Sequence, residues 1–137
     1  MGRRVSERYL LETNAASAIL RQREPVSARA ASVPLASLAI SSVTAAEMHY
    51  GVEKHPQATA LAKLVREFLR YTDILPWTDA IAPHYGTLRA ALETKGITIA
   101  PLDLMIAAHA LAVDATLISA DQVLLQIDIL KIEDWSA

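Results

Sequence analysis

Four acidic residues follow short apolar segments at widely separated points of the chain. They are Glu12 after YLL, Glu47 after AISSVT, Asp103 at the start of LDLMIAAHAL and Asp121 after ATLIS. Carboxylates that crowd together repel one another, and a hard divalent cation relieves that repulsion. Mg²⁺ and Mn²⁺ favour oxygen ligands and take a few carboxylates together with water and substrate phosphate. The four acids therefore predict a metal centre, provided that the fold brings them together.

Each acid also has a local structural explanation, which the sequence leaves open. Asn14 would be a helix N-cap in a turn that includes Glu12. Thr44 and Glu47 have the spacing of a capping box, in which the glutamate folds back onto the backbone. Asp103 would interact favourably with a helix dipole. Asp121 would cap the short helix behind it. These explanations treat the acids one by one and do not account for an acid at nearly every strand-to-helix exit.

The elements that must position these acids alternate along the chain. The predicted strands are residues 8–11, 35–41, 73–77, 115–119 and 129–133. The predicted helices are residues 15–23, 27–34, 44–54, 58–71, 79–96 and 102–113, with a short helix or turn at 121–127. This alternation predicts an α/β fold with a parallel sheet between helices on both faces. Ligands bind at the carboxyl ends of such strands, where the four acids are expected to meet.

Composition narrows the class of protein further. The 137 residues fit one domain, and 53% of them are apolar, which argues against disorder. The chain has no cysteine, so disulfides and thiolate metal sites are excluded. No apolar run is long enough for a membrane helix, and the net charge of −2 allows only local contact with nucleic acid. We expect residues 1–8 to be a disordered extension and residues 9–137 to form the domain.

The chain resembles a PIN-domain ribonuclease, and more closely the VapC toxins of bacterial VapBC toxin–antitoxin pairs. The segments that carry the resemblance are YLLETN, AISSVTAAEMHYGVEK, ILPW, HYGTLRAALETKG, PLDLMIAAHALAVDATLIS and ILKIEDW. Their order and spacing agree with the family over nearly the whole chain. The resemblance implies a three-layer α/β/α fold, a homodimer, a VapB-type antitoxin partner and a cytoplasmic location. It also implies a Mg²⁺- or Mn²⁺-dependent endoribonuclease, a hydrolase that leaves 5′-phosphate and 3′-hydroxyl ends.

The resemblance also assigns roles to individual residues. The family's acidic cluster, which is both catalytic and metal-binding, maps onto Glu12, Glu47, Asp103 and Asp121. Polar residues that would orient the carboxylates or water are Asn14, Thr44 and Ser119. Arg89 is a candidate for phosphate contact, with a solvated helix position as the equal alternative.

Two further residue types are interpreted as structural. His109 lies about 600° around a helix from Asp103, so it does not share that face, and a packed or surface histidine is favoured over a ligand. Trp77 and Trp135 are interpreted as closing the core rather than stacking on bases.

The sequence departs from the family pattern at residue 12, where the family has aspartate. Glutamate keeps the charge on a longer stem, so we expect metal binding with weak cleavage of RNA. The alternative is a catalytically degraded PIN fold that binds only antitoxin or RNA. A receiver-type phosphotransfer module is disfavoured, because LLETN has a single acid and no lysine ends a strand before the last one. The sequence names neither the RNA nor the antitoxin.

Overall fold

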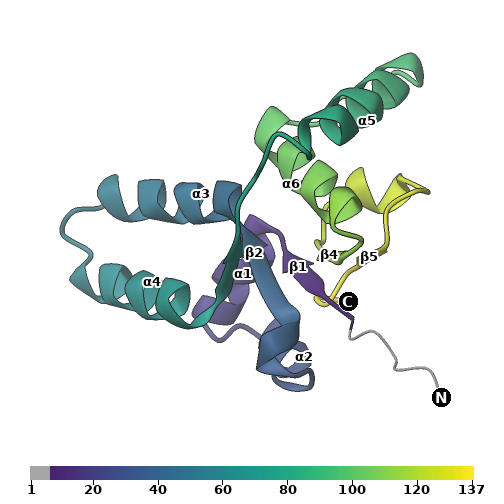
Figure 1. The fold of residues 1–137 in the computed structure, drawn as a ribbon. Helices are drawn as coiled ribbons and strands as arrows, with labels where there is room; N and C mark the ends of the chain where they lie inside the picture. The colour runs from purple at the N-terminus through teal and green to yellow at the C-terminus, as the bar shows by residue number, and fades with distance from the viewer. Residues whose placement is uncertain (1–6) are drawn as a thin grey trace.

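The computed structural model describes residues 7–137, which form a five-stranded sheet between two layers of helices (Figure 1). All four strand pairings are parallel, and the strand order is β3-β2-β1-β4-β5. The strands are β1 (Tyr9–Leu11), β2 (Leu38–Ser41), β3 (Asp73–Leu75), β4 (Thr116–Ile118) and β5 (Ile132–Glu133). The parallel sheet with helices on both faces confirms the predicted fold class.

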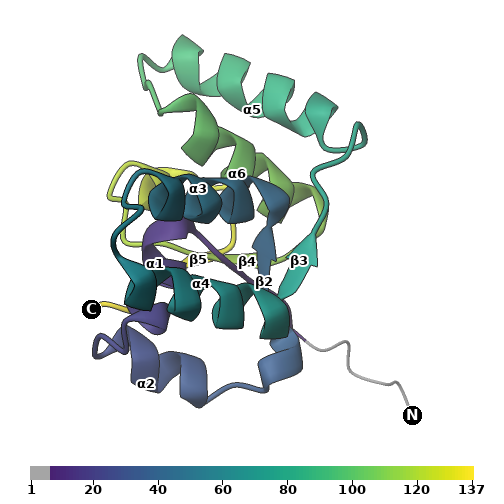
Figure 2. The same cartoon turned by 90° about the vertical axis from the view of Figure 1, so that its left-hand side faces the viewer.

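Six α-helices connect the strands within the described residues. They are α1 (Thr13–Leu20), α2 (Val26–Ala31), α3 (Ser42–Glu53), α4 (Thr59–Tyr71), α5 (Ala82–Thr94) and α6 (Pro101–Ala112). Helices α1 to α4 cover one face of the sheet, and α5 and α6 cover the other (Figures 1 and 2). The termini of the helices follow ordinary sequence signals, since Pro101 begins α6 and Gly96, with φ of +74°, follows the end of α5.

The strands bury both faces, because alternate side chains point to opposite layers. Leu10 on β1 and Leu117 on β4 pack with α5 and α6, whereas the next residues, Leu11 and Ile118, pack with α1 to α4. All four are at most 1% exposed. Burial of each such side chain stabilises the fold by about 1.5–3 kcal/mol. This two-sided burial explains why the strands have continuous apolar sequences instead of alternating ones.

Two predicted boundaries around residue 41 are wrong. The predicted strand 35–41 begins as a 3₁₀ turn at Leu35–Ser37, and only its last four residues pair with neighbours. The predicted helix at 44–54 begins at Ser42, because the hydroxyl of Ser41 accepts the amide of Val43 at 3.1 Å and caps the helix. Ser41, at the end of β2, is therefore the cap of α3. Because α3 begins two residues earlier than predicted, Thr44 and Glu47 lie inside the helix and not at its cap.

The described end of the predicted N-terminal extension contacts the domain. Residues 1–6 lie outside the described residues. Arg8 forms an ion pair with Asp73 at 2.7 Å, and a carboxylate oxygen of Glu7 accepts a hydrogen bond from Thr116 at 3.1 Å. None of the helices in residues 7–137 has the length and apolar character needed to cross a membrane.

Candidate active site at the carboxyl edge of the sheet

The four acids lie on segments that meet at one edge of the sheet, where the strands have their carboxyl ends. Glu12 directly follows β1, Glu47 lies on the helix that follows β2, and Asp121 lies three residues after β4. Asp103 lies in the first turn of α6, the helix that runs into β4 from the same edge. The charges of three of the acids influence one another. Burial raises the pKa of Asp103 above its usual value, and the charges of Glu47 and Asp121 raise it further.

Glu12 is a helix cap and a member of this acidic group at the same time. Its Oε1 accepts the amides of Asn14 at 2.9 Å and Ala15 at 3.2 Å, so it is the N-cap of α1. The predicted N-cap, Asn14, is wrong because the helix begins two residues earlier than predicted, at Thr13. Glu12 is only 5% exposed, and burial raises its pKa even though the two amides oppose that shift. Nearby Asp103 and Glu47 raise it further.

Glu47 does not close a capping box. Helix α3 begins at Ser42 with Ser41 as its cap, so Glu47 lies beyond the first turn. The hydroxyl of Thr13 donates to Oε1 of Glu47 at 2.6 Å. The predicted helper Thr44 is fully buried, and its hydroxyl lies 3.5 Å from that of Thr13. Glu47 is therefore tied to the start of α1, the element that Glu12 caps.

Asp121 caps the turn that precedes the 3₁₀ helix Leu124–Gln126, whose N-cap is Val123 and not Asp121 as the sequence suggested. Its Oδ1 accepts the amides of Val123 at 2.8 Å and Leu124 at 3.2 Å. The predicted helper Ser119 is 2% exposed, and its hydroxyl accepts the amide of Asp121 at 3.0 Å. The cap does not remove Asp121 from the group, because its charge is one of the causes that raise the pKa of Asp103.

The acidic group has no cation of its own among the described residues. The four ion pairs in residues 7–137 involve Asp73, Glu133, Glu93 and Asp114 instead. Crowded carboxylates without a counter-ion have the donor chemistry of a site for a hard cation.

The side chains do not converge fully, however. No three acidic or histidine side chains among residues 7–137 come close enough to form a metal-binding group. The capping and hydroxyl contacts explain this spacing, because Glu12, Glu47 and Asp121 each have one oxygen held by the protein. Each has a second oxygen that accepts no hydrogen bond from a described residue. The backbone thus brings the acids to one edge, although their side chains do not form a metal-binding group there.

The remaining predicted residues lie elsewhere. Asn14 is exposed beside Glu12. Arg89 lies on the outer face of α5, where its guanidinium pairs with Glu93 at 3.0 Å and donates to Tyr85 at 3.1 Å. Its position therefore matches the solvated-helix alternative. His109 is fully packed, as expected, and its Nδ1 lies 2.8 Å from the hydroxyl of Ser41.

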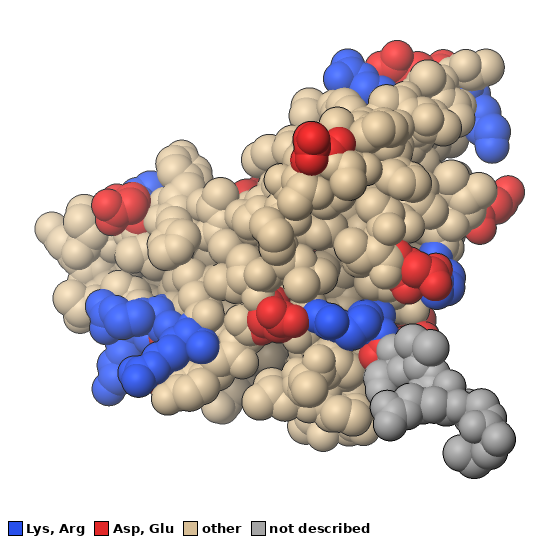
Figure 3. Space-filling model, in the orientation of Figure 1, with Lys and Arg blue, Asp and Glu red and all other residues tan. Residues whose placement is uncertain are grey.

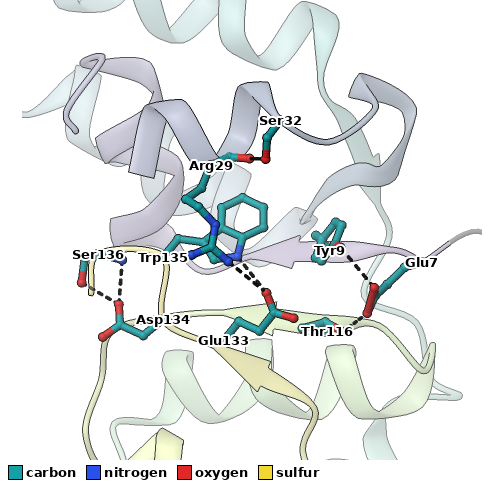
Figure 4. A network of polar contacts seen from close by, with 9 residues as sticks. All are labelled: Glu7, Tyr9, Arg29, Ser32, Thr116, Glu133, Asp134, Trp135 and Ser136. Carbon is teal, nitrogen blue, oxygen red and sulfur yellow. Dashed lines mark hydrogen bonds and ion pairs between the residues drawn. The ribbon is translucent and has the colours of Figure 1, made fainter. Parts of the chain in front are cut away.

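Trp135 is part of the core, as interpreted from the sequence, whereas Trp77 is only half-buried and lies outside the core clusters. Trp135 is 2% exposed and packs against Tyr9 and Arg29 (Figure 4). The sequence reasoning missed Thr13, although it stands inside YLLETN. The available signal was its hydroxyl at the start of the helix after β1, because the helix that carries Glu47 follows the neighbouring strand β2.

The comparisons with known proteins agree with this architecture. A sequence model of the PIN domain matches residues 9–130. The ribonuclease VapC2 of Rickettsia felis is 39% identical over 83 residues, which span 61% of this chain and 62% of that protein, less than two thirds of its length. The tRNA(fMet)-specific endonuclease VapC of Shigella flexneri is 30% identical over 131 residues, 94% of this chain and 98% of that protein.

A solved structure extends the likeness to three dimensions. The VapBC2 complex of Rickettsia felis bound to a DNA fragment from their promoter contains a chain that superposes with a TM-score of 0.82. The two chains are 32% identical, and the match covers 91% of this chain and 96% of that chain. With the PIN-domain match over most of the sequence and a relative aligned over nearly its full length, the chain belongs to the PIN-domain family, within its group of VapC ribonucleases.

Proposed function

We propose that this chain is the endoribonuclease toxin of a VapBC-type toxin–antitoxin pair. The observation that carries the proposal is the gathering of Glu12, Glu47, Asp103 and Asp121 at the carboxyl edge of the sheet without a protein cation among the described residues. The relatives named as ribonucleases and the VapBC complexes support the same conclusion. An RNA phosphodiester is the substrate that this chemistry fits.

A divalent cation, Mg²⁺ or Mn²⁺, completes the proposed site. The oxygens of the four acids would hold it, and when bound it lowers the pKa of a coordinated water and shields the charge on the phosphate. The protein supplies the rest of the chemistry. Thr13 and Ser119 orient Glu47 and the backbone at Asp121 through their hydroxyls. A carboxylate oxygen of the group that does not bind the cation would be suited to accept a proton from the attacking water.

Contact with the RNA backbone requires local positive charge. Arg89, the candidate from the sequence, is already paired with Glu93. On the face shown in Figure 3, lysine and arginine side chains gather over α4. Lys63, Arg66 and Arg70 are exposed there at helical spacing, and none takes part in the ion pairs of residues 7–137. This stripe is a better candidate for phosphate contact than Arg89.

The proposed partners follow from the same family membership. A VapB-type antitoxin would bind the chain and place a cationic residue against the acidic group. Tyr50 on α3 and Leu64 on α4 are 65% and 46% exposed, which offers apolar contact area for a second chain. A homodimer and a cytoplasmic location, where a toxin would meet its RNA, are parts of this proposal.

The test is single-turnover cleavage of a defined RNA by the purified chain, with Mg²⁺, with Mn²⁺ and with a chelator. We expect cleavage only with a metal ion, and its loss in Asp103→Asn although that variant still folds with a cooperative melting transition. Cleavage that persists in the chelator or in Asp103→Asn would contradict the proposal. A chain that binds antitoxin and RNA but shows no cleavage even as Glu12→Asp would favour the degraded-site alternative.

A further inference from the structure

A fully buried polar pair lies beneath the acidic group. Ser41, the last residue of β2, is 0% exposed, and His109 on α6 is 1% exposed. The Ser41 hydroxyl and Nδ1 of His109 are 2.8 Å apart. The same hydroxyl accepts the amide of Val43, so its hydrogen is available for an unprotonated Nδ1. Burial lowers the pKa of His109, which agrees with a neutral ring.

A second connection runs beside this pair. The amide of Trp77 donates to the hydroxyl of Ser42, the first residue of α3, at 2.9 Å. The indole Nε1 of the same tryptophan donates to the carbonyl of Met105 on α6, also at 2.9 Å. Two polar connections therefore join the first turn of α3 to α6, one through a buried hydroxyl and one through Trp77.

These two helices carry two of the four acids. Glu47 lies on α3 and Asp103 on α6, and the charge of Glu47 is one cause of the raised pKa of Asp103. A rotation or shift at the start of α3 would move Glu47 relative to Asp103, because a helix moves as a rigid element. The contacts of Ser41 and Ser42 fix that start.

We propose that His109 is a positioning residue of the acidic site, which acts through Ser41 to fix the start of α3 and hence Glu47 relative to Asp103. The inference rests on the proposed function and adds a residue that touches neither metal nor RNA. The chemistry of the position supports a role beyond filling space. Its neighbours Ile106, Ala107 and Ala110 on α6 are apolar and fully buried, and a polar ring in such a place costs free energy unless it is hydrogen-bonded.

The test compares three variants with the parent chain. His109→Leu fills the space but offers no acceptor to the Ser41 hydroxyl. His109→Asn restores an acceptor, Oδ1, at the same bond separation from Cβ as Nδ1. Leu130→Ala is the control for stability, because Leu130 is 7% exposed, precedes β5 at the far side of the sheet from β3, and leaves a cavity when truncated.

Two readouts are taken at a temperature at which every variant is folded. One is the dissociation constant for Mn²⁺ by calorimetry without RNA, and the other is the rate of RNA cleavage at saturating Mn²⁺. We expect His109→Leu to weaken Mn²⁺ binding about 10-fold and to slow cleavage, as loss of a supporting hydrogen bond does at metal sites. His109→Asn should recover most of the affinity, and Leu130→Ala should keep the parent value despite its lower melting temperature.

Ser41→Ala is the second route to the same answer if His109→Leu does not fold, and it should weaken Mn²⁺ binding in the same way. Equal Mn²⁺ affinity in His109→Leu, Ser41→Ala and Leu130→Ala would overturn the inference, and so would a failure of His109→Asn to recover affinity. A parent chain that binds Mn²⁺ but cleaves no RNA would remove the proposed nuclease function while the Mn²⁺ comparison still decides the role of His109. A parent chain that binds no Mn²⁺ would overturn both.

Discussion

The two edges of the central sheet differ in how they neutralise acidic side chains. At the amino edge, Asp73 at the start of β3 pairs with Arg8 at 2.7 Å. Glu7 accepts the hydroxyls of Tyr9 and Thr116, both at 3.1 Å (Figure 4). These contacts tie the beginnings of β1, β3 and β4 together.

At the carboxyl edge, Glu12, Glu47 and Asp121 receive only amide and hydroxyl donors from the described residues, and no cation among those residues pairs with any of the four acids. Glu133 at the end of β5 has Arg29 within 3.7 Å and the indole of Trp135 within 2.9 Å, but it is outside this group (Figure 4). The fold therefore pairs an acid with a cation at the amino edge, where Asp73 meets Arg8. It leaves charge uncompensated where we propose that a metal ion binds.

Glu47→Gln removes one charge from the uncompensated edge and keeps an acceptor for the Thr13 hydroxyl. We expect near-parent stability without metal and a loss of RNA cleavage of at least about 100-fold, at the upper end of effects seen around metal ligands. The measurements are cleavage rates and melting curves with and without Mg²⁺. A melting temperature that still rises with Mg²⁺ as in the parent would remove Glu47 from the site.

Glu12→Asp shortens the side chain at the same edge without changing its charge. We expect cleavage to become faster by about one to two orders of magnitude, because a misplacement of about 1 Å is worth a factor of that size. Stability should change little, because aspartate is also a good N-cap for α1. Single-turnover cleavage by both forms at equal Mg²⁺ measures the effect. Equal rates would show that the site tolerates the longer side chain.

Asp103→Asn tests whether the buried, crowded charge of Asp103 destabilises the metal-free chain. The pKa of Asp103 is raised in the folded chain, so the folded state binds more protons than the unfolded state, and the stability from this group is lost as pH rises through the folded pKa. The variant should therefore melt higher than the metal-free parent at about pH 7.5, with a smaller difference at about pH 4.5. A difference that is independent of pH would show that Asp103 is not under this strain.

Arg8→Gln at the amino edge should have the smallest effect. The ion pair with Asp73 is partly exposed, with side-chain exposures of 38% and 53%, and such pairs contribute about 0.2–1 kcal/mol. We expect a slightly lower melting temperature that depends on salt, with unchanged Mg²⁺ response and cleavage. An altered Mg²⁺ response would contradict the separation of the two edges, because it would mean that the Arg8–Asp73 pair influences metal binding at the carboxyl edge.

The fold was predictable because the strands and helices differ clearly in length and apolar pattern. The segments YLL and ATLIS and the run of apolar residues in α6 place the sheet and its covering helix correctly. The edge at which the acids gather followed from parallel topology alone. Capping was harder to predict, since Glu12 caps α1 two residues before the predicted cap Asn14, and Ser41 caps α3 three residues before Thr44.

The orientations of the side chains were beyond the sequence. Whether Glu47 turns to the backbone or to Thr13 depends on where α3 begins and on which strand lies beside β2. His109 could be judged as packed, but its partner Ser41 is 68 residues away, and only the assembled layers bring the two together. Long-range polar pairs of this kind leave no periodic signal in one sequence.

The cap that Glu12 forms on α1 makes two backbone amides sensitive to the state of the acidic edge. The amides of Asn14 and Ala15 both donate to one oxygen of this carboxylate. If a cation binds as proposed and draws charge from Glu12, these hydrogen bonds should weaken, and the resonances of the two amides should shift in an NMR spectrum. The first turn of α1 is therefore a built-in spectroscopic reporter, which allows metal occupancy to be followed in the intact chain without RNA or a label.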